Sequence, residues 1–163
     1  MKSAVLCISP HHGNTNKIAN IMADALEAAL LKPEEATSEL LSKFDLIGFG
    51  SGIYYGKHHK SLLKVVNSLP TSMNKKAFVF STAGVSDRLV ERNLANNHKK
   101  LRNKLEEKGF RIVGEFSCCG FMTWGYYRLL GGRNNNRPDE NDLKRVRDFA
   151  EKLKTTMRDS QES

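Results

Sequence analysis

The sequence AVLCISPHHGNT at positions 4–15 decides the fold of this chain. Its first five residues form an apolar run of strand length, and the remainder consists mostly of turn formers and short polar residues. From Ile18 to Leu30, apolar residues recur at steps of three and four, which is the spacing of one helical face, and Pro33 stops the pattern. The segment therefore predicts a strand, a polar loop and an amphipathic helix.

The same alternation continues to the end of the chain. Further strands are predicted at residues 36–38, 44–49, 77–80 and 111–117, and further helices around residues 62–69, 90–105 and 139–153. Strands that alternate with helices form right-handed βαβ units, and these build a parallel sheet covered on both faces. We therefore predict a three-layer, doubly wound α/β/α domain at residues 1–157, followed by a polar tail at 158–163.

Composition sets the class of protein. The 163 residues, 39% hydrophobic and 27% charged, suit one globular domain and not a disordered chain. No apolar run reaches the roughly 20 residues of a membrane span, and no cleavage site follows the first apolar run, so we expect a cytoplasmic protein without a transmembrane segment. Three cysteines, two of them adjacent, indicate a reducing compartment rather than a disulfide framework.

Charge is distributed unevenly. The formal net charge is +8, and residues 88–163 hold 17 basic and 11 acidic side chains against nine and seven in residues 1–87. A basic surface attracts acidic partners, nucleic acid or anionic membranes. We expect a partner protein with an acidic face and at most a peripheral membrane contact, and the sequence does not indicate the oligomeric state.

Ligands of open α/β sheets lie beyond the carboxyl ends of the strands. The loops at that edge are predicted to begin at Ser9, Gly50, Ser81 and Cys118. In the first of them, Gly13-Asn14-Thr15 opens a helix, so backbone N–H groups and the helix dipole can hold a phosphate, with side-chain donors beside them. The spacing fits neither a P-loop nor a dinucleotide fingerprint, which favours a mononucleotide. The alternative is that Asn14 or Thr15 is only an N-cap.

Residues 9–15 resemble the phosphate loop of the flavodoxin family, in which a hydroxyl-rich stretch ends in Gly-Asn-Thr at the start of the first helix. The order and length of the remaining elements are similar to those of short-chain flavodoxins. The resemblance implies a five-stranded parallel sheet in the order 2-1-3-4-5 that binds FMN, and flavodoxin is itself a standard example of this rule. Pro10 and His12 stand where the family commonly has hydroxyl residues, and the imidazoles of His11 or His12 could replace those donors.

The resemblance also implies which residues contact the cofactor. One loop holds the phosphate, and two others lie along the two sides of the isoalloxazine ring. The predicted contacts are Ser9, His11, His12, Gly13, Asn14, Thr15, Gly52, Ile53, Tyr54, Tyr55, Gly56, Thr82, Ala83, Gly84 and Cys118. We expect a peptide within Gly52–Gly56 to reorient toward flavin N5 on reduction, and we predict no catalytic side chain and no metal site.

Several of these side chains have alternative interpretations. Tyr54 and Tyr55 could stack on the flavin or pack in the core, and the same holds for Trp124, Tyr126 and Tyr127 in the long loop that follows the last strand. Cys118 and Cys119 are either redox thiols or small buried residues, and Cys7 is expected in the core. The pairs His11-His12 and His58-His59 could converge as metal ligands or as donors around an anion, and His98 is expected to be half-buried.

Three functions follow from these observations. The first is an FMN-binding protein that carries electrons between redox partners. The second is a flavodoxin-like FMN oxidoreductase acting on a quinone or a protoporphyrinogen, because residues 51–60 are similar to the menaquinone-dependent protoporphyrinogen oxidases; an NAD(P)H-dependent reductase is a further enzymatic option. The third is a flavin-free module whose basic segment, residues 88–111, contacts nucleic acid. We favour the electron carrier and expect no nucleic-acid partner.

Overall fold

The computed structural model describes residues 1–10, 13–123 and 129–162. Its parallel strands are β1 (Ser3–Ile8), β2 (Ala29–Leu31), β3 (Leu46–Tyr54), β5 (Lys76–Ala83) and β6 (Arg111–Cys119). They lie in the order β2-β1-β3-β5-β6, and the short strand β4 (Lys57–His58) pairs antiparallel with β3 outside this path. The predicted order 2-1-3-4-5 is therefore confirmed, with β4 as an addition.

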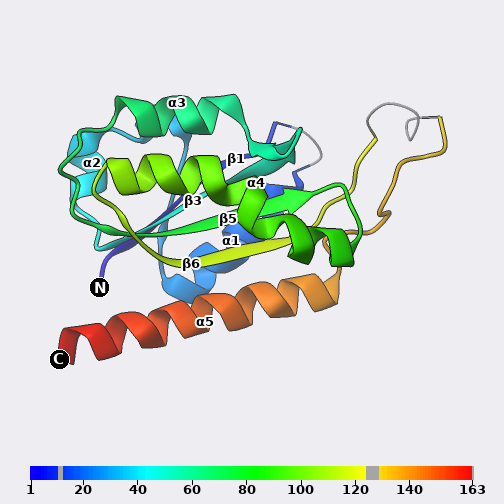
Figure 1. The fold of residues 1–163 in the computed structure, drawn as a ribbon. Helices are drawn as coiled ribbons and strands as arrows, with labels where there is room; N and C mark the ends of the chain where they lie inside the picture. Colours follow the sequence, from blue (N-terminus) through cyan, green and yellow to red (C-terminus); the bar gives the residue numbers. More distant parts are fainter. Residues whose placement is uncertain (11–12, 124–128, 163) are drawn as a thin grey trace.

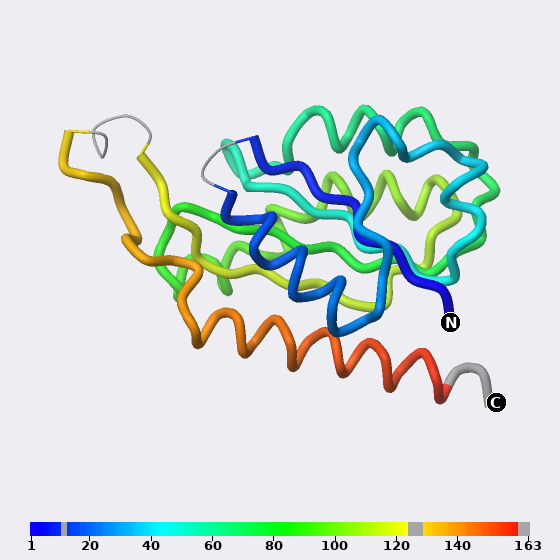
Figure 2. Tube along the Cα trace, turned by 180° about the vertical axis from the view of Figure 1, so that it is seen from behind, coloured from blue at the N-terminus to red at the C-terminus, as the bar shows by residue number. Residues whose placement is uncertain are grey.

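Helices cover both faces of the sheet (Figure 1). They are α1 (Asn14–Leu26), α2 (Ser38–Ser42), α3 (Lys60–Ser68), α4 (Asp87–Glu107) and α5 (Glu140–Glu162), with a 3₁₀ turn η1 (Pro33–Glu35) after β2. Helices α1 and α5 pack together on one face, and α3 and α4 lie on the other. The N-terminus and the end of α5 lie at one end of the molecule, and the described parts of the loop after β6 extend from the other, as both views show (Figure 2).

Each face of the sheet has its own buried core. Ile18 and Met22 of α1 pack with Val146 and Ala150 of α5 over one face. Leu62 and Val66 of α3 pack with Leu101 and Leu105 of α4 over the other. Apolar residues on both sides of the strands explain why the central strands read as nearly continuous apolar runs.

Two glycines make room for aromatic rings in the middle of the sheet. Gly48 pairs in register with Phe78, and Gly50 pairs with Phe80. A Cβ added at either glycine would lie 2.2 Å from the ring of its partner, so no larger residue fits without moving a fully buried phenylalanine. The rings restore the apolar contact that a glycine in a strand would otherwise lack.

The prediction for the second strand was wrong. Helix α1 ends at Leu26, because Glu27 adopts a left-handed conformation with φ of 52° and caps the helix. Ala29–Leu31 then forms β2 against β1, and residues 36–38 form no strand. Three apolar residues fit a helical and an extended pattern equally well, and pairing with β1 decides between them.

The strands at the carboxyl edge are also longer than predicted. Residues 50–54 continue β3 instead of forming a loop, and β5 and β6 extend to Ala83 and Cys119. Their serines and threonines pair in register inside the sheet. Residues 158–162, predicted as a tail, continue α5, because no glycine or proline interrupts the helix there.

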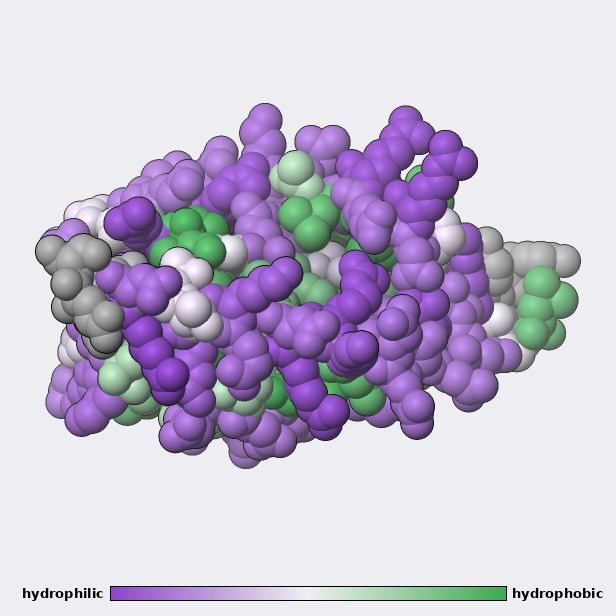
Figure 3. Space-filling model, turned by 90° about the horizontal axis from the view of Figure 1, so that it is seen from below, coloured by the Kyte–Doolittle hydropathy of each residue, from purple (hydrophilic) through white to green (hydrophobic). Residues whose placement is uncertain are grey.

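The outer surface of the α5 side is mostly hydrophilic (Figure 3). Among the helices of the described residues, none is long and apolar enough to cross a membrane.

Candidate functional site

The N-terminus of α1 opens at the carboxyl edge of the sheet. Gly13 is its N-cap, with φ of 66°, and the N–H of Lys17 donates to the Gly13 carbonyl at 3.0 Å. The N–H groups of residues 14–16 precede this first helical hydrogen bond and have no acceptor within the helix. A Cβ built on Gly13 would meet no described atom within 4 Å. These backbone N–H donors at the start of the helix suit a phosphate group.

Asn14 and Thr15 connect α1 to the neighbouring loops. The Asn14 amide donates from Nδ2 to the carbonyl of Phe121 at 2.7 Å, and the hydroxyl oxygens of Thr15 and Thr82 are 2.8 Å apart in a buried contact. The alternative that one of them is the N-cap is wrong, because Gly13 occupies that position. Both side chains are hydrogen-bonded within the protein, so a phosphate here would be held chiefly by backbone N–H groups. Ser9 is half-buried after β1, and His11 and His12 lie outside the described residues.

The predicted loop at Gly52–Gly56 is a β-hairpin. Tyr54 pairs with Lys57, and the two residues between them, Tyr55 and Gly56, have φ of 50° and 72°. Positive φ at both central positions is typical of the type I′ turn. The Tyr54 ring packs edge-on against His59, with centroids 5.4 Å apart, whereas Tyr55 is 84% exposed. Of the two aromatic rings, Tyr55 is thus the one presented to solvent.

The segment after β5 packs against the long loop after β6. The N–H of Gly120 donates to the Ala83 carbonyl at 2.9 Å, and a Cβ at Gly84 would come within 2.5 Å of the Met122 sulfur. A Cβ at Gly120 would likewise crowd Asn14 and Thr82. Three of the predicted loops, at α1, β5 and β6, therefore meet at one place. Trp124, Tyr126 and Tyr127 lie outside the described residues.

The base of the long loop is held by Arg137, which the sequence analysis missed. Its guanidinium donates to Asp142 at 2.5 and 2.8 Å and to Asp87 at 2.6 and 3.1 Å. Asp139 caps α5, since its carboxylate accepts from the N–H of Asp142 at 2.9 Å. The carboxylates lie at the N-termini of α4 and α5, so the arginine joins two helix starts. In the sequence, Arg137 is one of 17 basic residues at positions 88–163, and nothing there marks it as the residue that makes this contact.

All three cysteines are buried and free. Burial raises the pKa of the Cys7 and Cys119 thiols to about 12 and that of Cys118 further still. Cys119 donates to the Val85 carbonyl at 3.0 Å and to the Asp87 carboxylate at 3.1 Å. A reactive cysteine needs a thiolate, so the structure favours the interpretation of Cys118 and Cys119 as small buried residues.

His58 and His59 have different partners, and His11 and His12 lie outside the described residues, so the convergence of the two histidine pairs stays a prediction. His58 is 3% exposed, with Nδ1 3.0 Å from the Ser51 hydroxyl, whereas Nδ1 of His59 accepts from the N–H of Ser61. His98, expected to be half-buried, is fully buried beside His58, because α4 packs on β4 and β6 at this point. No group of three or more metal-ligating side chains occurs among the described residues.

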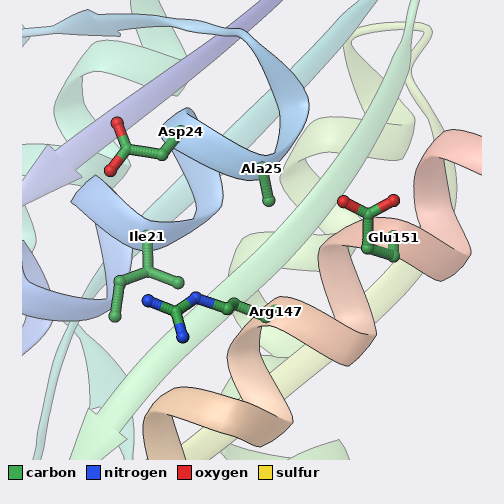
Figure 4. Close-up of a pocket in the computed structure, with 5 residues that line it drawn as sticks. All are labelled: Ile21, Asp24, Ala25, Arg147 and Glu151. Carbon is green, nitrogen blue, oxygen red and sulfur yellow. The ribbon is translucent and has the colours of Figure 1, made fainter.

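A shallow pocket on the α1 and α5 side lies away from this edge. Ile21, Asp24 and Ala25 line it from α1, and Arg147 and Glu151 from α5 (Figure 4). None of these residues belongs to the strand ends where the predicted loops converge, so the pocket is separate from the candidate site.

Comparison with known proteins agrees with this arrangement. The family model described as Flavodoxin domain matches residues 5–119. An uncharacterized protein of Methanocaldococcus jannaschii is 46% identical over 153 residues, which make up 94% of this chain and 98% of that protein.

Solved structures with similar folds include two flavodoxins. A short-chain flavodoxin associated with a bacterial microcompartment superposes with a TM-score of 0.67 at 17% identity, covering 96% of this chain and 99% of that one. The Fusobacterium nucleatum flavodoxin bound to flavin mononucleotide gives 0.63 at 15% identity, with 95% and 98% covered. At these identities the likeness concerns the fold. The family model, in contrast, spans most of the sequence, and the chain belongs to the flavodoxin domain family.

Proposed function

We propose that this protein binds FMN at the carboxyl edge of its sheet and carries electrons between redox partners. Membership of the flavodoxin domain family supports a redox flavoprotein. The observation that carries the proposal is the N-terminus of α1 at the carboxyl edge of the sheet, where Gly13 in a left-handed conformation precedes three backbone N–H groups that have no acceptor within the helix. A terminal phosphate is the cofactor group that such a site suits.

The described residues fit a mononucleotide flavin. The N–H groups of residues 14–16 would bind its phosphate, and the hairpin at Gly52–Gly56 and the segment Thr82–Gly84 would flank its ring system. Tyr55, of which 84% is exposed, would be the ring that stacks on the flavin. When bound, the flavin supplies the electron-transfer chemistry, and the protein binds it, orients it and sets its surroundings.

The hairpin turn offers a peptide that can respond to reduction. Gly56 has φ of 72°, a conformation glycine adopts at little cost, and its side of the turn is exposed. We propose that a peptide in Gly52–Gly56 reorients to hydrogen-bond flavin N5 when the ring is reduced. The hairpin strands beside it are fixed by the pairing of Ile53 with His58, so the change would be confined to the turn.

The electron-transfer partner is proposed to be a protein with an acidic face. Residues 88–163 carry a net +6; α4 and α5 hold 12 of the 17 basic and 9 of the 11 acidic side chains of this part, so half of the excess lies on the helices and half on the segments between and beside them. Complementary charge raises association rates more than it raises affinity, which suits a carrier that must bind and leave quickly.

The phosphate role of the α1 N-terminus can be tested by changing Gly13. In Gly13→Val, a β-branched residue is forced to a φ of 66°, and we expect FMN affinity to fall by about tenfold or more. Gly131→Val is the matched control, because Gly131 has φ of 78° and equally open surroundings. Fluorescence titration with FMN and with riboflavin measures the effect.

Two results would contradict the proposal. If the wild-type protein bound FMN and riboflavin with equal affinity, the phosphate would contribute nothing to binding, and the proposed phosphate site would be wrong. Rapid turnover of a quinone or a protoporphyrinogen by the reduced protein would replace the carrier with an oxidoreductase.

A further inference from the structure

A row of serines crosses the sheet directly behind the candidate site. Ser51, Ser81 and Ser117 are register partners on β3, β5 and β6, and all three are buried. Each serine stands immediately before a residue that is predicted to contact the cofactor: Gly52, Thr82 or Cys118. Successive residues of a strand face opposite sides and lie about 3.3 Å apart along it, so the serines occupy the α3 and α4 side of the same strand ends.

The middle of this row is bonded to a buried imidazole. Nε2 of His98 lies 2.7 Å from the Ser81 hydroxyl, which in turn lies 2.8 Å from the Ser117 hydroxyl. Nδ1 of His98 lies 2.9 Å from the Glu115 carboxylate, which also accepts from Arg102 at 2.5 Å. Ser81–His98–Glu115 has the connectivity of a hydrolytic triad, yet Ser81 and His98 have no exposed surface, so no substrate can reach the hydroxyl.

The hydrogen bonds of His98 accommodate two protonation states. A carboxylate only accepts, so Nδ1–H donates to Glu115 in either state. With a neutral ring, Nε2 accepts from Ser81; with a charged ring, Nε2–H donates to Ser81, which then donates to Ser117. The extra proton on Nε2 thus has a hydrogen-bond acceptor in Ser81 and a counter-charge in the Glu115 carboxylate on the other side of the ring, and a buried charge needs both kinds of partner.

His58 does not offer a second proton position. The Ser51 hydroxyl oxygen accepts from the N–H of His59 at 2.9 Å and lies 2.9 Å from the Gly52 carbonyl, to which it donates. Nδ1–H of His58 therefore donates to Ser51, and among the described residues Nε2 has no hydrogen-bond partner that could accept from it when protonated. Its ring centroid lies 4.9 Å from that of His98, so a charge on one imidazole opposes a charge on the other.

We propose that His98 is a buried proton-binding site that takes up one proton from solvent when one electron reaches the cofactor, an inference that rests on the proposed function. With FMN bound, the electron would come from a reduced donor protein, and the matching proton would come from water to Nε2 of His98. The charge of the region is then unchanged. The described groups that face His98 are His58, Ser81, Glu115 and, on its own helix, Arg102, and Glu115 is its one anionic neighbour.

Two properties favour proton uptake at His98: its closeness to the cofactor edge and the low dielectric of the buried region. Ser81 adjoins Thr82, which contacts the start of α1 through Thr15, so the proton site and the cofactor edge are separated by one layer of the sheet. Charges in such a water-poor region interact more strongly than charges in water. Reduction therefore favours the charged form of His98, and by reciprocity the protonation of His98 favours reduction.

Histidine ring NMR on the full chain tests the inference. Titrations are recorded without cofactor, with oxidised FMN and with FMN reduced by dithionite. We expect the His98 midpoint to move to higher pH on reduction while His58 stays neutral throughout. The midpoint potential, measured separately, should fall with rising pH between the two His98 midpoints. Glu115→Gln should lower the His98 midpoint in all three forms and weaken that pH dependence, and Glu115→Asp should restore part of it.

The control is Glu107→Gln, which removes the same charge from an exposed position of α4 and should leave both measurements unchanged. An identical His98 midpoint in the oxidised and reduced protein overturns the inference, as does a His98 that shows no titration in the folded range. Failure of FMN to bind is seen separately in the cofactor titration and overturns the proposed function together with this inference. Should Glu115→Gln not fold, the wild-type titrations decide alone.

Discussion

His58 is buried beside another imidazole, and this position has a measurable cost. Desolvation by burial, together with the charge of His98, holds the pKa of His58 well below its usual 6.5. The unfolded chain therefore binds a proton below pH 6.5 that the folded chain does not bind. It follows that stability rises with pH through this range and is lost as the pH falls from 6.5 toward 5.

We predict that this residue contributes a slope approaching about 1.4 kcal/mol per pH unit below pH 6.5. Urea unfolding at about pH 7.0, 6.5, 6.0 and 5.5 measures this slope of the free energy of unfolding against pH. His58→Gln should flatten the curve, and Lys57→Gln, on the exposed neighbouring residue, should not. Equal slopes for the wild-type protein and His58→Gln would show that His58 titrates normally.

At the scale of elements, the starts of α4 and α5 depend on one arginine. Asp142 has no exposed surface, and hydrogen bonds from Arg137 keep its carboxylate paired. Removing one partner of a buried ion pair leaves an uncompensated charge, so we expect Arg137→Met to lower the free energy of unfolding by about 3–5 kcal/mol. Arg137→Lys should recover little, because an ammonium cannot reproduce the two-pronged contact.

Urea unfolding and limited proteolysis of the long loop check this prediction. Arg147→Met on the exposed face of α5 is the matched control, expected within about 0.5 kcal/mol of the wild-type protein. Adding Asp142→Asn to Arg137→Met should restore part of the loss, since it removes the stranded charge. A loss below 1 kcal/mol, roughly the value of a surface pair, would show that the contact is not a structural clamp.

The elements also show how far sequence reasoning reaches. Apolar runs and helical spacing predict the parallel sheet and four of the helices, because each element buries a face that periodicity records. The order of the strands came from the resemblance to flavodoxins. The position of β2 could not be predicted, since Ala29–Leu31 fits both patterns and only pairing with β1 selects the strand. The hairpin at residues 50–58 was hidden for a similar reason, because its polar serines and glycines read as a loop while Phe80 fills the space above Gly50.

For the candidate site, the sequence predicted which loops come together but not the buried hydrogen-bond network behind them. The loops that meet at the carboxyl edge follow from topology, and the contact between Thr15 and Thr82 places two predicted residues together. The network of His98 and Glu115 could not be predicted, because it joins residues on α4 and β6 that are 17 positions apart. The serines at positions 51, 81 and 117 were a signal in the sequence, but they show a row across the sheet only when the register of the strands is known.

At the scale of the molecule, the net charge of +8 governs encounters. Charges that are exposed are screened over about 10 Å at 0.1 M salt. We predict that the rate of electron exchange with a small acidic iron–sulfur protein falls at least tenfold, or roughly 1.4 kcal/mol, between low and high ionic strength, while exchange with dithionite changes far less. Stopped-flow absorbance measures both. An electron-exchange rate that does not change with salt would contradict the proposal that the partner protein has an acidic face.

The central claim is that the chain is an FMN electron carrier, and anaerobic stepwise reduction of the FMN-loaded protein tests it most directly. We predict visible flavin absorption at about one FMN per chain and two separate one-electron steps during the titration, because a carrier exchanges electrons singly. A colourless protein whose spectrum and stability added FMN does not change would contradict the claim. A single two-electron step would contradict the carrier role and leave a flavoprotein of another kind.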